Sequence, residues 1–454
     1  MATFELSGQF GEVRAGTSND ESHADSPMFD IPFIRPNPPS LRSLGPDLAR
    51  IEASGIFTNY GPTNGRFERA LENDMFGGRG SCLTVCNATI GLMMAIRYVV
   101  DRAEAKNGGL PRGIRGRRYA LMPSFTFAAA AQAADWVGLT PLFCDIDEGD
   151  WAASAAAEDS LIQQYGNEIA VIVPYATFGN NIDLKRYERI AAETGIPIVV
   201  DAAASLGSLE LFGEAFGASF PYPIVFSMHA TKTFSTGEGG VIYSTDRTAI
   251  SDLRTMGNFG FGESRSATMP GLNSKISEVS ALLALTRLKD FDVVVGHRER
   301  LAILYRSLLP GWGFQRMNGL RCAYQFMPVL PPAMVTMTRD EIVAALKSRG
   351  IGAACYFAPH VADQPYFRDR AVCGDLTVTE RVSRTIIALP LWDGMTGEMV
   401  KIICETLMEI CGFGALPTSA SASASHATIP SMNSALAQLD SFSDRVIPLM
   451  EIAT

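Results

Sequence analysis

The sequence carries no excess of positive charge. Its 38 lysine and arginine residues stand against 48 aspartate and glutamate residues, which gives a formal net charge of −10. Proteins that bind nucleic acid or anionic membranes through charge present basic surfaces, so this balance supports neither kind of partner. We therefore expect small-molecule ligands and neither a nucleic-acid nor a membrane partner.

Long apolar runs are also missing. No run in the sequence reaches the ~20 consecutive apolar residues that a membrane-spanning helix needs. The first residues, MATFELSGQFGEVRAG, lack the basic segment and the apolar core of a secretory signal peptide. The sequence therefore predicts a cytoplasmic protein.

Cysteine and histidine show no metal-binding pattern. The eight cysteines include no C-x-x-C pair, and several lie in apolar stretches such as CLTVC at 82–86, so we expect buried, reduced thiols. The five histidines are scattered, without the spacing of H-E-x-x-H or a similar zinc motif. The sequence predicts no metal site.

Short apolar runs recur through the middle of the chain. Between them lie segments with helical periodicity, such as IDLKRYERIAAETG, which ends in a glycine. Strands that alternate with helices form mainly parallel sheets covered on both faces. We therefore predict an α/β fold whose large domain has a seven-stranded, mainly parallel sheet between helices. The predicted strands are 82–86, 119–123, 140–146, 169–175, 196–202, 223–228 and 240–245.

The pattern changes near residue 286, and a smaller α+β domain is expected beyond it. The stretch TRLKDFDVVVGHRERLAILYRSLL predicts one long helix at this point. A Ser/Ala-rich stretch near residue 420 is typical of flexible linkers, and the polar, acidic start is typical of poorly ordered segments. The predicted organisation is a poorly ordered segment at 1–30, a large domain at 31–286, a small C-terminal domain at 287–413, a linker at 414–431 and a segment of unknown role at 432–454.

One lysine has an unusual setting in the stretch SMHATKTFSTGEGG at 227–240. Lys232 has small residues and three glycines around it, where a lysine would ordinarily lie among other surface charges. In open α/β sheets, ligands bind beyond the carboxyl ends of the strands, so residues at those ends are candidates for a shared site. Ser227 lies at the end of the strand before Lys232. Asp201 lies at another strand end among alanines, where a carboxylate is costly unless a cation pairs with it.

Two further strand ends complete the set of candidate residues. After 82–86, the residues Asn87, Ala88 and Thr89 open a helical segment whose free backbone N–H groups would suit a phosphate. An ordinary asparagine N-cap explains the same residues and, taken alone, is favoured. After 119–123, Phe127 places an aromatic ring at a loop edge, where by itself it predicts only core packing.

Together these residues match the requirements of pyridoxal 5′-phosphate (PLP). The cofactor needs a lysine amine of lowered pKa to form a Schiff base, and an aspartate beside its pyridine nitrogen. It also needs an aromatic face against its ring, and hydroxyl groups with a helix N-terminus for its phosphate. No single residue is specific, but the ordered set predicts a PLP site in which small residues around Lys232 allow close approach.

Several longer motifs occur in a fixed order along the chain. They are FTNYGPTNGRFE (57–68), NATIGL (87–92), PSFTFAAAAQA (123–133), FCDID (143–147), VVDAAASLGS (199–208), FSMHATKTFSTGEGG (226–240) and GLNSKISEVSALL (271–283). In this order they resemble the sugar aminotransferase family often named DegT/DnrJ/StrS, within the fold-type I PLP enzymes of the aspartate aminotransferase superfamily. The resemblance extends from about residue 31 to residue 412.

The resemblance implies a role for each matching residue. Lys232 would be the Schiff-base lysine and would move the proton between the α-carbon of the amino donor and the cofactor. The implied cofactor-binding residues are Asp201 at the pyridine nitrogen, Phe127 against the ring, Ala88, Thr89 and Ser227 at the phosphate, and Asn273 at the phosphate of the neighbouring subunit's cofactor. A homodimer with shared active sites is implied, with the loop 257–273 crossing between subunits. Substrate contacts are expected from FTNYGPTNG, this loop and the small domain.

Three positions need separate interpretation. Ala204 stands where many family members carry a glutamine or histidine that contacts the cofactor. His360 is offset from the family's small-domain histidine, and a plain surface or capping role is an equal alternative. Some relatives replace the lysine with a histidine and carry out dehydration. Because Lys232 is present here, we expect His229 to be a packing residue or to lie beside the cofactor.

The predicted activity is that of a PLP-dependent aminotransferase. The resemblance implies glutamate or glutamine as donor and a nucleotide-diphosphate-linked keto-deoxysugar as acceptor, for polysaccharides or glycosylated metabolites. A cyclitol ketone is the alternative acceptor. A non-transaminating PLP enzyme or a PLP-binding regulatory protein of the same fold is the alternative function, and the joint presence of Lys232, Asp201 and Thr89 argues against it.

Overall fold

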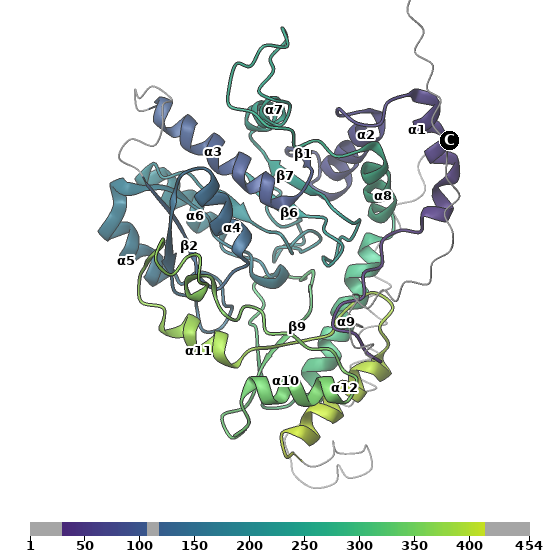
Figure 1. The fold of residues 1–454 in the computed structure, drawn as a ribbon, viewed down its shortest axis with the longest axis vertical. Helices are drawn as coiled ribbons and strands as arrows, with labels where there is room; N and C mark the ends of the chain where they lie inside the picture. Colours follow the sequence, from purple (N-terminus) through teal and green to yellow (C-terminus); the bar gives the residue numbers. More distant parts are fainter. Residues whose placement is uncertain (1–29, 107–117, 414–454) are drawn as a thin grey trace, which may run out of the picture. The chain divides into compact units, whose positions relative to one another are not determined.

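The structure, a computed structural model, describes residues 30–106 and 118–413 (Figure 1). The predicted linker at 414–431 and the segment at 432–454 lie outside the described residues, as do residues 1–29 of the predicted N-terminal segment. Within the described part of the chain, none of the helices combines the length and the apolar character needed to cross a membrane.

The central sheet is built from the apolar runs that the sequence predicts as strands. Its strands are β1 (Ser81–Val85), β2 (Tyr119–Pro123), β3 (Thr140–Cys144), β4 (Ile169–Ile172), β5 (Val200–Asp201), β6 (Ile224–Ser227) and β7 (Gly240–Ser244). They pair in the orders β1-β7-β6-β5 and β10-β3-β2-β4, where β10 (Val372–Cys373) comes from the C-terminal part of the chain. Parallel bridges from Ile172 to Ile198 and from Tyr175 to Asp201 join β4 to β5 in one continuous sheet. All pairings are parallel except those of β7, which confirms the predicted mainly parallel sheet.

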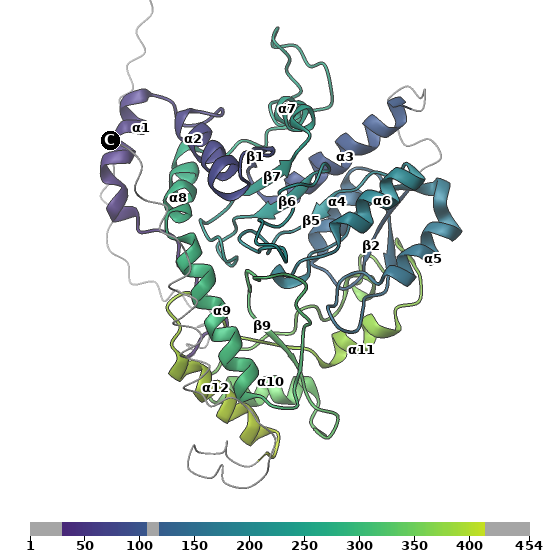
Figure 2. The same cartoon turned by 180° about the vertical axis from the view of Figure 1, so that it is seen from behind.

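Helices cover both faces of this sheet (Figure 1, Figure 2). Successive residues of β2 alternate between two apolar cores, because side chains along a strand point to opposite faces. Tyr119 and Leu121 belong to one core and Ala120 and Met122 to the other. The first core is shared with α2 (Pro62–Ala70), α5 (Ala155–Tyr165) and α6 (Leu184–Thr194), and the second with α3 (Ala88–Lys106), α4 (Ala128–Trp136) and α7 (Arg247–Met256).

Helix α6 shows why the sequence periodicity succeeds. Asp183 lies at its N-cap, where the carboxylate accepts a hydrogen bond from a first-turn N–H group at 3.0 Å. Leu184, Tyr187 and Ile190 form the buried stripe. The helix ends at Gly195, whose φ of 70° lies in the left-handed region that glycine adopts without steric cost.

The C-terminal part of the described chain has an antiparallel sheet of its own. Its order is β11-β9-β8, from β8 (Gly313–Phe314), β9 (Met327–Leu330) and β11 (Ile387–Leu389). The remaining α-helices are α1 (Gly45–Ser54), α8 (Glu278–Leu288), α9 (Phe291–Leu308), α10 (Arg339–Ser348), α11 (Thr377–Thr385) and α12 (Gly397–Ile410). Short 3-10 or π turns lie at η1 (Leu41–Leu44), η2 (Leu71–Met75), η3 (Gly166–Glu168), η4 (Thr177–Gly179) and η5 (Val361–Asp363). This mixture has the expected α+β character, while the domain boundaries stay predictions.

Two local features differ from the sequence predictions. The predicted long helix is divided into α8 and α9 by a break at Lys289 and Asp290. Aspartate favours helix starts, and apolar periodicity alone does not show such a break. In addition, Ile31 pairs with Ile351, and the indole N–H of Trp392 donates to the carbonyl of Pro32 at 2.9 Å. The start of the predicted large domain therefore packs against the C-terminal part of the chain.

The cysteines are less uniformly buried than predicted. All eight are free thiols, and Cys82, Cys144, Cys322 and Cys404 are buried. Cys373 is exposed, and the other three are partly exposed. The prediction of buried thiols is therefore wrong for half of them, because the apolar run around a cysteine does not show which side of the element faces solvent.

Candidate active site

A cavity of about 850 Å³ lies beyond the carboxyl ends of β5 and β6. The N-terminal residues of α3 and α4 contribute to its wall. Six of the seven residues predicted to bind the cofactor or to catalyse line this one cavity: Ala88, Thr89, Phe127, Asp201, Ser227 and Lys232. The seventh, Asn273, is exposed, pairs with Asn258 in the loop after α7, and does not line the cavity within one chain.

Lys232 lies in the loop that follows β6, with its amine directed into the cavity. Its backbone N–H donates to the carbonyl of His229 at 2.9 Å. The side-chain Nζ donates to Oε1 of Gln325, also at 2.9 Å. Burial lowers the pKa of Lys232 to about 8, although the charge of Asp201 opposes the shift. The amine is therefore much easier to deprotonate than that of a surface lysine.

The glycines after Lys232 allow close packing of the backbone. A Cβ atom at Gly239 would lie 2.5 Å from Cε of Met228, and the φ of Gly239 is 157°. A Cβ atom at Gly240 would lie 2.9 Å from the backbone nitrogen of Ala88. These approaches exclude larger residues, so glycine lets the start of β7 pass directly beside the start of α3.

Asp201 ends β5 and is 2% exposed. One carboxylate oxygen accepts the backbone N–H of Ala203 at 3.1 Å. Burial raises the pKa of Asp201 to about 6, while the Ala203 N–H and the charge of Lys232 act in the opposite direction. Within the described residues, no arginine lies in ion-pair contact with this carboxylate. Its remaining acceptor capacity fits the protonated ring nitrogen of PLP.

The start of α3 presents unpaired backbone donors to the same cavity. The side-chain oxygen of Asn87 accepts the N–H of Ile90 at 2.9 Å, so the N-cap interpretation is confirmed. The N–H groups of Ala88 and Thr89 have no acceptor in the described part of the chain. The N-cap and a phosphate site at residues 87–90 are therefore compatible, since the cap uses one N–H group and leaves others for a phosphate. Ser227 adds a hydroxyl, whose oxygen accepts the N–H of His229 at 3.2 Å.

Phe127 occupies the N-cap position of α4. Its side chain is 58% exposed, although it lines the cavity. A buried core position, which was the alternative interpretation, is therefore wrong. An exposed ring at the cavity wall fits a stacking contact with a planar cofactor.

The sequence did not predict several cavity residues that come from distant segments. Gln325, which contacts the lysine amine, lies 93 positions after it, between β8 and β9. No motif marks it, so no signal in a single sequence could have identified it. The other unpredicted lining residues include Tyr175, Phe326, Tyr356 and Phe357.

The two histidines of uncertain role have distinct positions. His229 lines the cavity, and its Nε2 lies 3.6 Å from Oε1 of Glu238. His360 is 2% exposed, and its Nδ1 lies 2.8 Å from the hydroxyl of Ser124. The surface role considered for His360 is therefore wrong, and burial lowers the pKa of its imidazole. Ala204 is buried and does not line the cavity, in contrast to the adjacent Ala203.

The segment FTNYGPTNG lies elsewhere in the single chain. Residues 55–62 with Arg66 and Arg69 line an open hollow of about 1000 Å³ that shares no residue with the cavity around Lys232. Within one chain, this segment therefore does not line the cavity around Lys232, and its expected substrate contacts stay a prediction.

Known proteins share both the sequence pattern and the fold. The model of the DegT/DnrJ/EryC1/StrS aminotransferase family matches residues 44–408. The protein Rv3402c of Mycobacterium tuberculosis H37Rv is 33% identical over 385 residues, which cover 84% of this chain and 90% of that protein. The dTDP-4-amino-4,6-dideoxy-D-glucose transaminase of Escherichia coli is 26% identical over 386 residues, which cover 83% of this chain and 98% of that enzyme.

A solved structure extends the comparison to three dimensions. A Bacillus cereus ATCC 10987 protein, whose crystal structure is named for a PLP-dependent aminotransferase, is 38% identical with a TM-score of 0.76. The match covers 83% of this chain and 99% of that protein. The cavity described above has the residues that such a cofactor needs. The chain therefore belongs to the DegT/DnrJ/EryC1/StrS family of PLP-dependent aminotransferases.

Proposed function

We propose that this enzyme transfers an amino group from glutamate or glutamine to a nucleotide-linked keto-deoxysugar, with Lys232 as the catalytic base and acid. One observation carries the proposal. Four separate segments of the chain bring the six predicted residues to a single cavity, where a lysine of lowered pKa lies near a buried carboxylate. Perturbed titratable groups that meet in one cavity are typical of catalytic sites.

The residues that would hold PLP come from different strand ends. The N–H groups at Ala88 and Thr89 and the hydroxyl of Ser227 would bind the phosphate, Phe127 would stack on the ring, and Asp201 would pair with the ring nitrogen. When bound, PLP supplies an aldehyde carbon that combines with amines and a ring that accepts electrons from the adjacent carbon.

Lys232 has the properties of a group that moves a proton. With a pKa of about 8, about a tenth of its side chains are neutral at pH 7 and can accept a proton. The protonated form can return the proton to a different atom, which is the task of a general acid and base near neutral pH. The free side chain is held by a hydrogen bond to Gln325 and lies in the field of Asp201, so its amine stays within the cavity.

The identity of the acceptor is supported by a relative and by the cavity. The Escherichia coli relative is named for a dTDP-linked amino sugar. Apolar side chains of α3 and α4, among them Met93 and Trp136, also line this cavity of about 850 Å³, a volume that suits a large acceptor. A cyclitol ketone remains the alternative acceptor. The role of the product in polysaccharide or glycosylated-metabolite synthesis is part of the same proposal.

We further propose a homodimer with shared active sites. Glutamate carries two carboxylates, which cations bind best, yet no arginine lines the cavity and Lys232 is its sole lysine among the described residues. The loop 257–273 projects beyond α7 (Figure 1) and carries the exposed Asn273, with Lys275 just after it. A neighbouring copy that inserts this loop would supply the missing polar groups.

The test begins with the absorbance of purified protein supplied with PLP. We expect a visible band that disappears with L-glutamate in the wild type and is absent in Lys232→Ala. Borohydride reduction followed by peptide mapping is expected to fix the cofactor on Lys232. A cofactor fixed on another lysine would overturn the assignment. After the donor step, a set of dTDP- and UDP-linked 4-keto sugars and a keto-inositol distinguishes the two acceptor classes.

Complementation tests the shared site. Lys232→Ala and Asn273→Ala are each expected to lose most activity. A mixture that exchanges subunits is expected to recover about a quarter of wild-type activity, because about half of the dimers are mixed and each mixed dimer has one intact site of its two. No recovery despite exchange would contradict the shared arrangement.

A further inference from the structure

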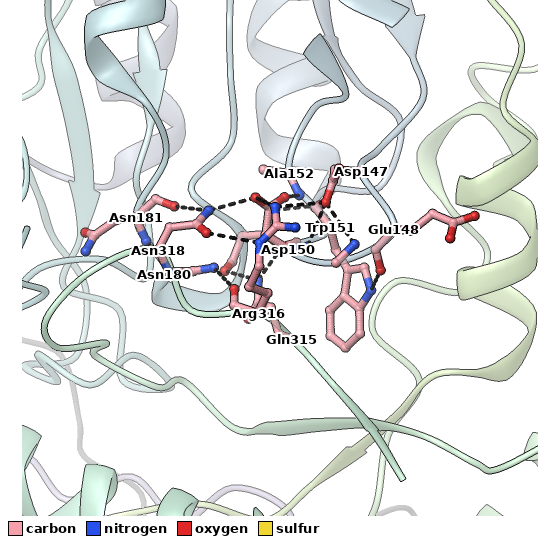
Figure 3. Close-up of polar contacts among 12 residues, drawn as sticks. Asp147, Glu148, Asp150, Trp151, Ala152, Asn180, Asn181, Gln315, Arg316 and Asn318 are labelled. Carbon is pink, nitrogen blue, oxygen red and sulfur yellow. Dashed lines mark hydrogen bonds and ion pairs between the residues drawn. The ribbon is translucent and has the colours of Figure 1, made fainter. Parts of the chain in front are cut away.

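Residues 315–325, here called the strap, run from β8 to the cavity. Along their length they are hydrogen-bonded to segments that follow the strands of the central sheet. At the first end, the side-chain amide of Gln315 donates to the carbonyls of Asp150 at 2.7 Å and Thr177 at 3.1 Å. Arg316 forms an ion pair with Asp150 at 2.9 Å, and the amide of Asn318 donates to the same carboxylate at 2.7 Å. Figure 3 shows these side chains converging on Asp150. This end is therefore tied to the segments that follow β3 and β4.

The middle of the strap pairs with the segment that follows β5. Leu320 donates its N–H to the carbonyl of Leu209 at 3.0 Å, and the N–H of Leu209 donates to the carbonyl of Arg321 at 3.0 Å. The N–H of Ala323 donates to the hydroxyl of Ser208 at 3.0 Å. Asp201 ends β5, so the strap is hydrogen-bonded to the segment that leads away from the buried carboxylate.

The last residues of the strap are held by two buried donors. The hydroxyl of Thr233, next to Lys232, donates to the carbonyl of Ala323 at 2.5 Å. Arg298 is 5% exposed and donates to the carbonyls of Tyr324 at 3.1 Å and Gln325 at 3.2 Å. Its other nitrogens pair with the carboxylate of Asp393 at 2.8 Å. Because all the guanidinium nitrogens of Arg298 have partners, a shift of this backbone would leave part of a buried charge unpaired, and such a loss is costly.

The side chain of Gln325 leaves this fixed backbone toward the amine of Lys232. Its Oε1 accepts a hydrogen bond from Nζ at 2.9 Å. We propose that Gln325 is a positioning residue that holds the amine of Lys232 in the cavity through a neutral hydrogen-bond acceptor. The strap fixes the backbone of Gln325 and so fixes the position of this acceptor. This inference rests on the proposed function, in which the same amine carries the proton.

The neutrality of Gln325 distinguishes it from a carboxylate of the same length. Besides Lys232, the titratable groups that line the cavity are Asp201 on β5, Tyr175 after β4, His229 and Glu238 on the loop of Lys232, and Tyr356 from the C-terminal part. A second carboxylate within hydrogen-bond distance would hold the amine in its charged form, which cannot accept a proton. An amide orients the amine without adding that charge.

The first measurement uses the apoprotein and needs no turnover. Trace acetic anhydride labels neutral amines, and mass spectrometry of the peptide that contains Lys232 gives the labelled fraction against pH. We expect Gln325→Glu to raise the midpoint of labelling by about one pH unit or more, a tenfold change in proton affinity. Gln132→Glu is the matched control, because Gln132 lines the same cavity and makes no hydrogen bond to Lys232 among the described residues. We expect a clearly smaller shift from this control.

The second measurement removes the acceptor at nearly constant volume. Gln325→Met is expected to slow the binding of PLP to the apoprotein by about tenfold, the loss of roughly one hydrogen bond to a charged group. Gln325→Glu keeps an acceptor oxygen, so if the methionine variant fails to fold, the labelling experiment with Gln325→Glu still decides the question. Unfolding is monitored by circular dichroism.

The outcomes separate this inference from the proposed function. Equal midpoints for Gln325→Glu and Gln132→Glu, or wild-type PLP binding by a folded Gln325→Met, would overturn the positioning role. Borohydride mapping in the wild type tests Lys232 independently. If mapping places the cofactor on Lys232 while position 325 has no effect, the inference alone fails. If mapping finds another lysine, the proposed function fails with it.

Discussion

Asp145 and Asp201 show how two similar strand ends serve different purposes. Asp145 directly follows β3 and Asp201 ends β5, and the two carboxylates are 8% and 2% exposed. Asp145 accepts three backbone N–H groups, from Ile146 at 2.9 Å, Val378 at 2.9 Å and Thr379 at 2.7 Å. The last two belong to the first turn of α11, so Asp145 fastens this helix to the sheet.

Asp201 has far fewer partners in the described part of the chain. It accepts the N–H of Ala203, and its pKa is raised to about 6 by burial. A buried carboxylate with unused acceptor sites lowers the free energy of unfolding unless a ligand donates the missing hydrogen bonds. Hydrogen-bond partners, and not the place at a strand end, therefore distinguish Asp145, which is used to hold a helix, from Asp201, which keeps acceptor capacity for a ligand.

The largest effect is expected when Asp201 loses its charge. Asp201→Asn should lower kcat by at least about 100-fold, since the group opposite the ring nitrogen no longer stabilises charge in the transition state. The free energy of unfolding of the apoprotein should not fall, because a costly buried carboxylate is removed. Single-turnover kinetics and urea unfolding check both parts. A variant whose kcat is within tenfold of the wild-type value would contradict a catalytic role for Asp201.

Asp145→Ala is expected to do the reverse. It leaves one buried and one partly buried N–H group at the start of α11 without an acceptor, so the free energy of unfolding should fall by about 2–3 kcal/mol. The rate per folded molecule should stay close to that of the wild type, because Asp145 does not line the cavity. Urea unfolding and active-site titration measure the two quantities. Unchanged stability with lost cofactor binding would break the contrast.

Lys232→Met tests whether the buried amine near Asp201 also destabilises the fold. The pKa of Lys232 is about 8 in the folded protein against 10.5 for an unperturbed lysine, so the folded state disfavours the charged amine. The variant should therefore stabilise the apoprotein by about 3 kcal/mol at pH 7. The gain should shrink as pH rises from about 8 to 10.5, where the unfolded amine also loses its proton. A gain that does not change over this range would contradict the lowered pKa.

The smallest effect concerns the pH dependence of Asp201 itself. Its folded pKa of about 6 lies above the ordinary 3.8, so the folded apoprotein favours the neutral acid. This contribution is fully present below about pH 4 and is lost as pH rises through 6, and the loss between pH 4 and pH 7 is about 2 kcal/mol. Comparison of wild type with Asp201→Asn between pH 4 and 7 isolates the slope. Identical slopes would show that Asp201 titrates normally and would weaken its contrast with Asp145.

The strands and six of the seven predicted site residues were predictable because they depend on neighbours in the sequence. Apolar runs predicted β1 to β7, and the rule that ligands bind at strand ends sufficed to group Lys232, Asp201 and Thr89 in one site. The break between α8 and α9 and the burial of His360 were not predictable in this way. Local periodicity continues across the break, and the burial of His360 depends on contact with Ser124, 236 positions away.

The sequence alone establishes the family, the α/β plan and the chemical kind of site, since each follows from short motifs and from periodicities of two or about four residues. The tertiary structure decides which of two strand-end aspartates is satisfied, which surface holds Asn273, and that Gln325 reaches the amine of Lys232. Those facts depend on hydrogen bonds between segments that only packing brings together. The sequence does not show which distant residue will become the hydrogen-bond partner of a given side chain.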